Sequence, residues 1–249
     1  MKYKLPIILL IFFSLESFCQ NKKTIDISAY YKGDTAQWRK EWCKFSDQLK
    51  LDNLINSGDT FHFRYWQDRQ VLDIWTNDYK TFHGLVTNFA IKYNPDNLKK
   101  KKPIPNKVFS NQIKLDTSIA HEAYKSIVDC LVLDIPSEGK IKDWKWGCDG
   151  MTYDFEISTK NSYLYKAYWS PDAQDSTLAE ARQIESFIVR INALLKLNKE
   201  FDKFSITLPY GSYRFKYSII RLVVGEYNPN YSDNNNENTL DDARDEFYY

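Results

Sequence analysis

Apolar residues recur at helical spacing in three segments, which predicts helices over about 35–56, 118–134 and 177–196. Thr177 with Glu180 has the spacing of a capping box, in which each residue's side chain accepts from the other's backbone amide. Each predicted helix carries its apolar residues on one stripe and therefore needs a partner surface to bury it.

Between these helices, apolar and polar residues alternate, which is typical of strands with one buried face. Gly84 is a candidate bulge within the third of them. Strands are predicted over 61–66, 71–75, 82–93, 151–157, 163–169 and 213–224. Because strands come in runs between helices, the pattern predicts an α+β fold. We expect an antiparallel sheet of about five to seven strands, covered on one face by about three helices.

The pair of strands over 151–169 is the clearest hairpin in the chain. Asp154 and Glu156 alternate with apolar residues and share one strand face, about 6–7 Å apart by strand geometry. They are predicted to face solvent, opposed by Lys166 on the returning strand. Trp169 closes that strand and is predicted to be a structural anchor where sheet and helix meet.

The N-terminal segment has the order of a secretory signal peptide. Lys2 and Lys4 precede an apolar run over 5–13, which is too short to span a bilayer. Cleavage is predicted between Cys19 and Gln20, so residues 1–19 would be a signal peptide. The alternative is a lipoprotein anchored at Cys19. Either way, we expect a periplasmic, secreted or membrane-anchored protein with no transmembrane segment after processing.

Charge divides the remaining chain into two parts. The whole chain has a formal net charge of +1, which does not favour nucleic-acid binding. Residues 226–249 carry seven acidic residues and one basic residue, with no apolar periodicity. We predict one α+β domain over 20–226 and an acidic, disordered tail over 227–249.

Candidate chemistry is sparse. Cys43, Cys130 and Cys148 could form one disulfide in an oxidising compartment, by any of three pairings, or remain free. No zinc-binding spacing, phosphate-binding loop or serine nucleophile motif is present, so no metal or cofactor is predicted. A cysteine nucleophile would require Cys148 to lie close to a histidine. The chain has three histidines, His62, His83 and His121.

A set of short motifs resembles a family of uncharacterised bacterial secreted proteins and lipoproteins. The motifs are the Gly147-Cys148-Asp149-Gly150 turn, a strand with Tyr153 and Glu156, and the closing Trp169-Ser170-Pro171. The likeness covers roughly residues 59–66 and 113–197. Tyr153 stands where many members have Trp, and Cys148 where many have Leu. The resemblance implies an exported α+β protein and assigns no activity.

Two functions follow as expectations. The first is a non-catalytic binding or interaction role in the cell envelope or outside the cell, with a protein or a glycan as ligand. The second is a hydrolase that uses Asp154 and Glu156, because paired carboxylates serve glycoside hydrolysis. A polar pocket containing both carboxylates and a histidine would favour the enzyme, and scattered exposed aromatic rings would favour the binding protein. No catalytic, binding or metal-binding residue is assigned.

Overall fold

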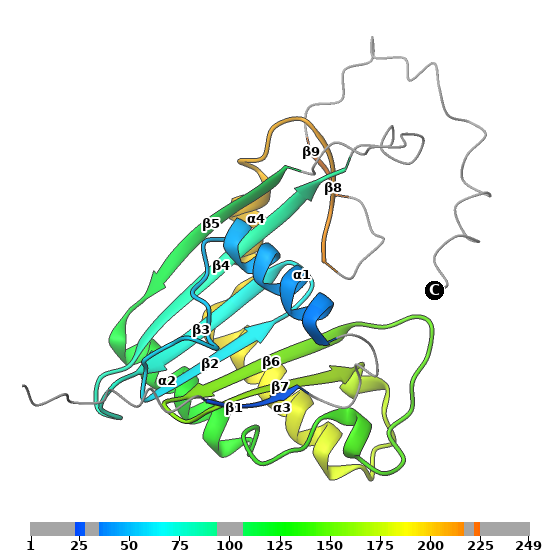
Figure 1. Ribbon diagram of the computed structural model, residues 1–249. Coiled ribbons are helices and arrows are strands. Elements are labelled where there is room, and N and C mark those ends of the chain that lie inside the picture. The colour runs from blue at the N-terminus through cyan, green and yellow to red at the C-terminus, as the bar shows by residue number, and fades with distance from the viewer. Residues whose placement is uncertain (1–22, 28–34, 94–106, 217–221, 225–249) are drawn as a thin grey trace, which may run out of the picture.

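The computed structural model describes residues 23–27, 35–93, 107–216 and 222–224, with the backbone alone for 35–41 and 222–224. The fold is α+β, as predicted, and is built on one sheet of nine strands (Figure 1). The strands are β1 (Thr24–Ile27), β2 (Phe61–Trp66), β3 (Gln70–Thr76), β4 (His83–Lys92), β5 (Val108–Leu115), β6 (Thr152–Thr159), β7 (Ser162–Trp169), β8 (Gly211–Arg214) and β9 (Leu222–Val224).

The strand order is β1-β7-β6-β2-β3-β4-β8-β9, with β5 also paired to β4. The prediction of a purely antiparallel sheet with five to seven strands is wrong. β1 runs parallel to β7, whereas the neighbouring β6–β7 and β2–β6 pairs are antiparallel. The sheet is therefore mixed, and it places β2 at its centre between β3 and β6.

Helices cover both faces of this sheet, which corrects the expectation of one covered face. α2 (Thr117–Asp129) and α3 (Ala179–Leu195) pack on each other and on one face, while α1 (Thr35–Gln48) crosses the other (Figure 1). α4 (Leu197–Ser205) follows α3 and packs near β4. Short 3-10 turns, η2 (Glu138–Lys140) and η3 (Pro171–Ala173), flank the β6–β7 hairpin.

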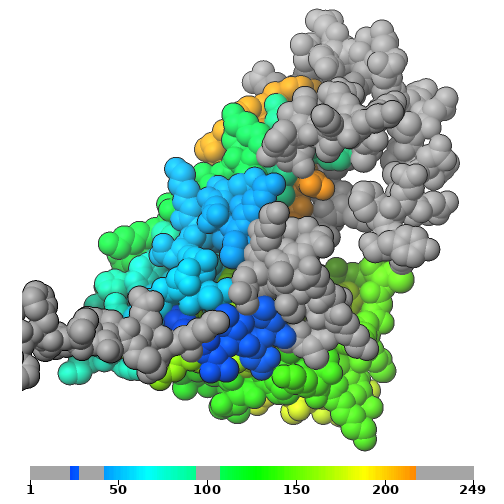
Figure 2. Space-filling model, in the orientation of Figure 1, coloured from blue at the N-terminus to red at the C-terminus, as the bar shows by residue number. Residues whose placement is uncertain are grey.

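The central strand β2 shows why both faces need cover. All six of its residues are buried. Phe63 and Tyr65 point toward Phe187 of α3, with ring centroids 5.7 and 5.5 Å away. On the opposite face, Trp66 meets Trp42 of α1 at 4.9 Å. In Figure 2, the blue atoms of α1 and of the segment after it form the molecular surface over this second face.

Several predicted boundaries differ from those observed. The first helix ends at Gln48. The segment after it packs against the sheet and buries Leu49, Leu51 and Leu54. The predicted strand over 213–224 is two short strands, β8 and β9. β1, β5 and α4 were not predicted, because β1 and α4 are short and the centre of β5 is the exposed polar run Ser110, Asn111 and Gln112.

Two local predictions are also wrong. Gly84 pairs regularly within β4, opposite Ile74, and makes no bulge. Its lack of a side chain serves packing instead, since a Cβ there would stand 2.7 Å from Leu115 Cδ1. The capping box does not form: Leu178 is the N-cap of α3 without a side-chain hydrogen bond, and Thr177 bonds Asp175.

The structure bears on the three cysteines and on membrane association. Cys43, Cys130 and Cys148 are all free thiols, so none of the three disulfide pairings is present. Among the described residues, no helix has the length and apolar character needed to cross a bilayer. The predicted signal peptide over 1–19 and the predicted acidic tail over 227–249 lie outside the described residues.

Candidate functional site

A set of charged side chains lies buried on the sheet face beneath α1. They come from three adjacent strands: His62 and Arg64 from β2, Asp73 from β3, and Asp154 and Glu156 from β6. None is more than 3% exposed. The prediction that Asp154 and Glu156 face solvent is therefore wrong. The alternation along β6 was predicted correctly, but its polar face is covered by α1 and the segment after it.

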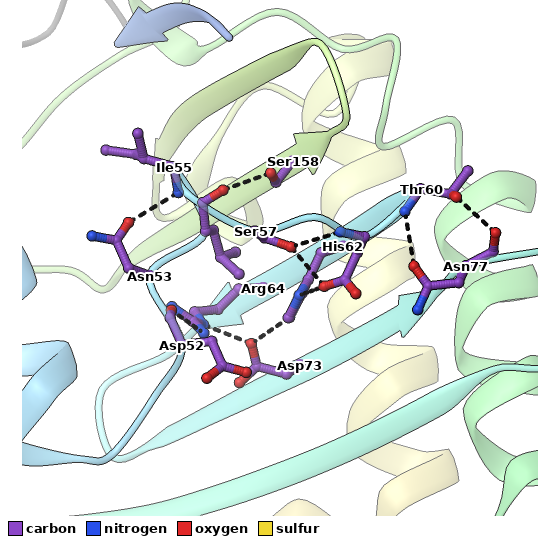
Figure 3. A network of polar contacts seen from close by, with 12 residues as sticks. Asp52, Asn53, Ile55, Ser57, Thr60, His62, Arg64, Asp73, Asn77 and Ser158 are labelled. Carbon is purple, nitrogen blue, oxygen red and sulfur yellow. Dashed lines mark hydrogen bonds and ion pairs between the residues drawn. The ribbon is translucent and has the colours of Figure 1, made fainter. Parts of the chain in front are cut away.

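His62 holds two carboxylates at once. Its Nδ1 lies 2.9 Å from Asp59 Oδ2, and its Nε2 lies 2.9 Å from Asp73 Oδ1 (Figure 3). Ionised carboxylates only accept hydrogen bonds, so both ring nitrogens carry protons and the ring is an imidazolium. Burial alone would lower the pKa of His62, but the bonds to Asp59 and Asp73 outweigh it and raise that pKa. A ring held in this state is unsuited to act as a general base.

Arg64 links this ion pair to β6. Its Nε donates to Asp73 Oδ1 at 2.6 Å, and its Nη2 donates to the carbonyl of Asp52 at 3.0 Å (Figure 3). Its Nη1 lies 3.6 Å from Glu156 Oε1. Burial raises the pKa of Asp73, but the charge of Arg64 and the bond from His62 overcome this and lower it. Asp73 therefore stays ionised, although its Oδ2 is buried without a hydrogen-bond partner.

The two carboxylates of the predicted hydrolase site are engaged by neighbouring donors. Glu156 accepts from Trp66 Nε1 at 2.6 Å and from the Tyr163 hydroxyl at 2.8 Å. Asp154 accepts from the Tyr165 hydroxyl at 2.5 Å and from Lys216 Nζ at 3.4 Å. Burial raises the pKa of Asp154, and the charge of Lys216 opposes this in part.

Lys216 joins this network to α1. Its ammonium lies 3.4 Å from the ring centroid of Trp42 and 4.3 Å from that of Trp66, which is cation–π geometry. Burial lowers the pKa of Lys216 to about 8, against the charges of Asp154 and Glu156. The face beneath α1 thus pairs cations with carboxylates throughout, as a buried ionic network must.

A small pocket reaches this network from the surface beside α1. Its cavity is about 20 Å³, which is room for about one water molecule. The lining residues are Trp42, Cys43, Ser46, Asp47, Asp52, Asn53, Leu54, Ile55, Arg64, Glu156 and Tyr163. Glu156 and Arg64 therefore line a pocket that one water molecule can occupy.

The other residues considered from sequence do not join this site. His83 packs against Trp75, and His121 stacks on Phe82. Cys148 is exposed, so the cysteine–histidine hypothesis has no geometric support. In the part of the chain that the structure describes, no group of three or more His, Cys, Asp or Glu side chains could hold a metal ion.

Lys166, predicted to oppose the carboxylates, points to the other side of the sheet. Its ammonium donates to the carbonyls of Val132, Leu133 and Ile135, at 3.3, 2.8 and 2.7 Å. These carbonyls follow the C-terminal end of α2, where a cation is electrostatically favoured. Lys166 therefore holds the α2–η2 connection onto β7.

No protein-family model matches this chain, and no curated protein matches it in sequence. The resemblance to uncharacterised secreted proteins thus remains a prediction. The structure does explain what its motifs do together. Gly147 and Gly150 lie against the ring of Trp169, and a Cβ at either position would come within 2.8 Å of that ring. The Ser170 hydroxyl accepts from the backbone N–H of Met151 at 3.0 Å.

These contacts build a corner at the end of the β6–β7 hairpin, and its exposed apolar groups were not predicted. We call the side chains of Trp146, Met151 and Trp169 the corner surface. Trp146 is 58% exposed and Met151 36%, while Trp169 is half-buried. No periodicity marks Trp146, because it lies in an irregular segment between η2 and β6.

The loop that carries Trp146 is tied down from beneath. The Gln174 side chain bonds both backbone groups of Lys145: its Oε1 accepts from the N–H at 2.8 Å, and its Nε2 donates to the carbonyl at 2.9 Å. Glu138, only 1% exposed, accepts from the backbone N–H of Trp169, and the Trp146 side chain interacts with the same carboxyl group. The exposed indole is therefore presented on a fixed support.

Proposed function

We propose that this protein is an exported, non-catalytic binding protein that acts in the cell envelope or outside the cell through the corner surface. The observation that carries the proposal is the exposure of Trp146 on a loop held by Gln174 and Glu138. An exposed ring that is already immobilised loses little entropy on binding, which favours a ligand platform.

A carbohydrate is the ligand class that fits this surface best. The flat face of an indole can stack on the C–H face of a sugar ring, while nearby polar groups bond its hydroxyls. Exposed Lys145 and Asp149 flank Trp146 and Met151 in the same loop. An exposed peptide with an aromatic or apolar side chain is the competing ligand.

The test is a glycan array and a peptide array probed with wild type and with Trp146→Ala. We expect glycan binding that falls at least about tenfold in the variant, because one well-placed aromatic contact contributes at least ~1.4 kcal/mol. Tyr210→Ala is the matched control, since Tyr210 is 56% exposed and lies outside the corner surface. Binding that survives in Trp146→Ala, or peptide binding alone, contradicts the proposal.

The hydrolase is supported by a different observation. Glu156 lines the pocket beside α1, and Asp154 and His62 lie on the same sheet face. Against it, both carboxylates are engaged by buried donors, so a substrate would have to displace α1 and rearrange those bonds. Hydrolysis of chromogenic glycosides by wild type, abolished in Glu156→Gln while that variant remains folded, would establish this function in place of the first.

Export is tested separately. Mass analysis of the mature N-terminus from native cells is expected to give Gln20 as the first residue. Cys19 as the first residue, carrying lipid, would establish the lipoprotein alternative. Met1 retained on a cytosolic protein would contradict export altogether.

A further inference from the structure

The strand β5 forms one margin of the sheet (Figure 1). Of the strands described, β4 is the one that pairs with β5. The two strands keep an unbroken antiparallel register over all 8 residues of β5, and the centre of β5, Ser110–Gln112, is exposed. A long, regular edge strand without a bulge can accept a further strand through its outward backbone groups.

The pairing with β4 decides which backbone groups of β5 point away from the sheet. The Lys92 N–H donates to the carbonyl of Lys107 at 2.8 Å, so these two residues form a hydrogen-bonded pair. Hydrogen-bonded pairs alternate along an antiparallel ladder, so the odd-numbered residues of β5 bond β4. The even-numbered residues direct their N–H and C=O groups outward. They are Val108, Ser110, Gln112 and Lys114.

A row of side-chain amides crosses the sheet and ends at this edge. Gln70 of β3, Asn88 of β4 and Asn111 of β5 lie opposite one another in register. Gln70 Nε2 donates to the carbonyl of Leu197 at 2.7 Å and to Asn88 Oδ1 at 2.6 Å. Asn88 Nδ2 then donates to Asn111 Oδ1 at 2.9 Å. Because the Leu197 carbonyl can only accept, the row has a fixed direction, and the NH₂ group of exposed Asn111 is its last donor.

We propose that β5 pairs antiparallel with β5 of a second copy of this chain, about a two-fold axis beside Asn111, so that one sheet continues through both copies. The observation that carries this is that the amide row ends at Asn111, which is also the midpoint of the outward-directed residues. With Asn111 opposite its own copy, Ser110 faces Gln112 and Val108 faces Lys114 of the second copy. All outward N–H and C=O groups of β5 then pair. A register shifted by two residues would leave groups at the strand ends unpaired.

The side chains suit the same register. Asn111 and its copy form a non-hydrogen-bonded pair, in which opposed side chains approach most closely. Each NH₂ group can there donate to the other Oδ1, because an amide oxygen accepts two hydrogen bonds. Half-buried Phe109 faces half-buried Ile113 of the second copy, and Lys114 faces Val108, so like charges do not meet. A second copy matches all these positions at once, which favours it over an unrelated peptide.

The test is sedimentation velocity on the protein in the form that the cell produces, over a hundredfold range of concentration. We expect a reversible change from one copy to two. Ser110→Pro removes an outward N–H and leaves the bonds to β4 intact, so it should fold and sediment as a single copy. Asn111→Asp keeps an acceptor for Asn88 but opposes two carboxylates at the axis, so it should weaken the dimer at least about tenfold. Asn56→Asp makes the same change at an exposed residue outside β5 and should dimerise as wild type does.

Disulfide cross-linking tests the register. Asn111→Cys is made together with Cys148→Ser, since Cys148 is an exposed thiol. The two introduced cysteines would have Cα atoms about 4.5 Å apart, within the span of a disulfide, so oxidation should give a covalent dimer. Lys114→Cys in the same background is the matched control. Its two copies would lie about 20 Å apart along the paired strands and should not cross-link.

Each measurement can overturn the proposal. A wild type that stays a single copy over the whole range refutes it, and so does a dimer that persists unchanged in Asn111→Asp. If Ser110→Pro does not fold, Asn111→Asp and the cross-link decide between the outcomes. A disulfide in Lys114→Cys rather than in Asn111→Cys contradicts the two-fold register. Binding of an extended peptide by a monomeric wild type would assign this edge to another protein. None of these outcomes depends on the corner surface or its ligand.

Discussion

Replacing Glu156 with Gln tests whether the network beneath α1 holds the fold together. The change keeps the shape of the side chain but removes its charge. Glu156 accepts from Trp66 Nε1 and from the Tyr163 hydroxyl, and lies 3.6 Å from Arg64 Nη1. A Gln amide has one acceptor oxygen, so one of the two buried donors would face an NH₂ group instead.

The magnitude follows from two effects. A buried donor left without a partner costs about 1–3 kcal/mol, and removing one partner of a buried ion pair costs about 3–5 kcal/mol. Arg64 retains Asp73, so only part of the second effect applies. We expect Glu156→Gln to lower the free energy of unfolding by about 3 kcal/mol, out of a typical ~5–15 kcal/mol.

Thermal melting and urea titration measure this loss. For a chain of this size, about 3 kcal/mol corresponds to a fall in Tm of about 6–12 °C. Glu122→Gln, which breaks only an exposed pair with Lys125, should stay within ~1 kcal/mol of wild type. If Glu156→Gln melted within about 2 °C of wild type, the carboxylate would be solvated and the assignment of this face to the interior would be wrong.

Four further variants probe other parts of the chain. Trp169→Ala should lower stability by about 3 kcal/mol, seen as a lower urea midpoint, and an unchanged midpoint would mean that the ring is not an anchor. Gly150→Ala should cost about 1–3 kcal/mol, because its Cβ would stand 2.7 Å from the Trp169 ring. Lys216→Met removes the cation beside Asp154 and should raise that carboxyl's already raised pKa further. A carboxyl group whose pKa is raised in the folded state destabilises the fold as it ionises. The Tm of Lys216→Met should therefore fall further below that of wild type at pH 8 than at pH 4, and an equal difference would contradict the prediction. Truncation after Glu226 should leave Tm within about 2 °C, since the removed segment has no apolar stripe; a larger fall would show that the tail packs on the domain.

The sequence was most informative where one periodic pattern covers a whole element. The alternation over 151–157 and 163–169 located β6 and β7 closely, because their pleat places successive side chains on opposite faces. Alternation does not show whether the polar face of a strand is exposed to solvent. Asp154 and Glu156 are buried because Trp42, which is more than 100 positions away in the chain, covers them as part of α1.

The corner surface was beyond prediction for a related reason. Trp169 lies at the end of β7, and its contacts with Gly147 and Gly150 depend on how the hairpin folds back. Glu138 and Trp146 lie in irregular segments, where no spacing rule relates a carboxyl to an indole. The sequence does not show that Glu138 is buried, because burial is decided by the tertiary fold.

The order of the strands has a consequence for when this chain can fold. Trp66 of β2 bonds Glu156 of β6 across 90 positions, and Lys23 beside β1 bonds Ser158 across 135. The centre of the sheet cannot close until the chain has been made as far as β6, and its β1 edge must wait for β7. Such non-local pairing slows folding, so the sheet is completed only after its C-terminal strands have been made.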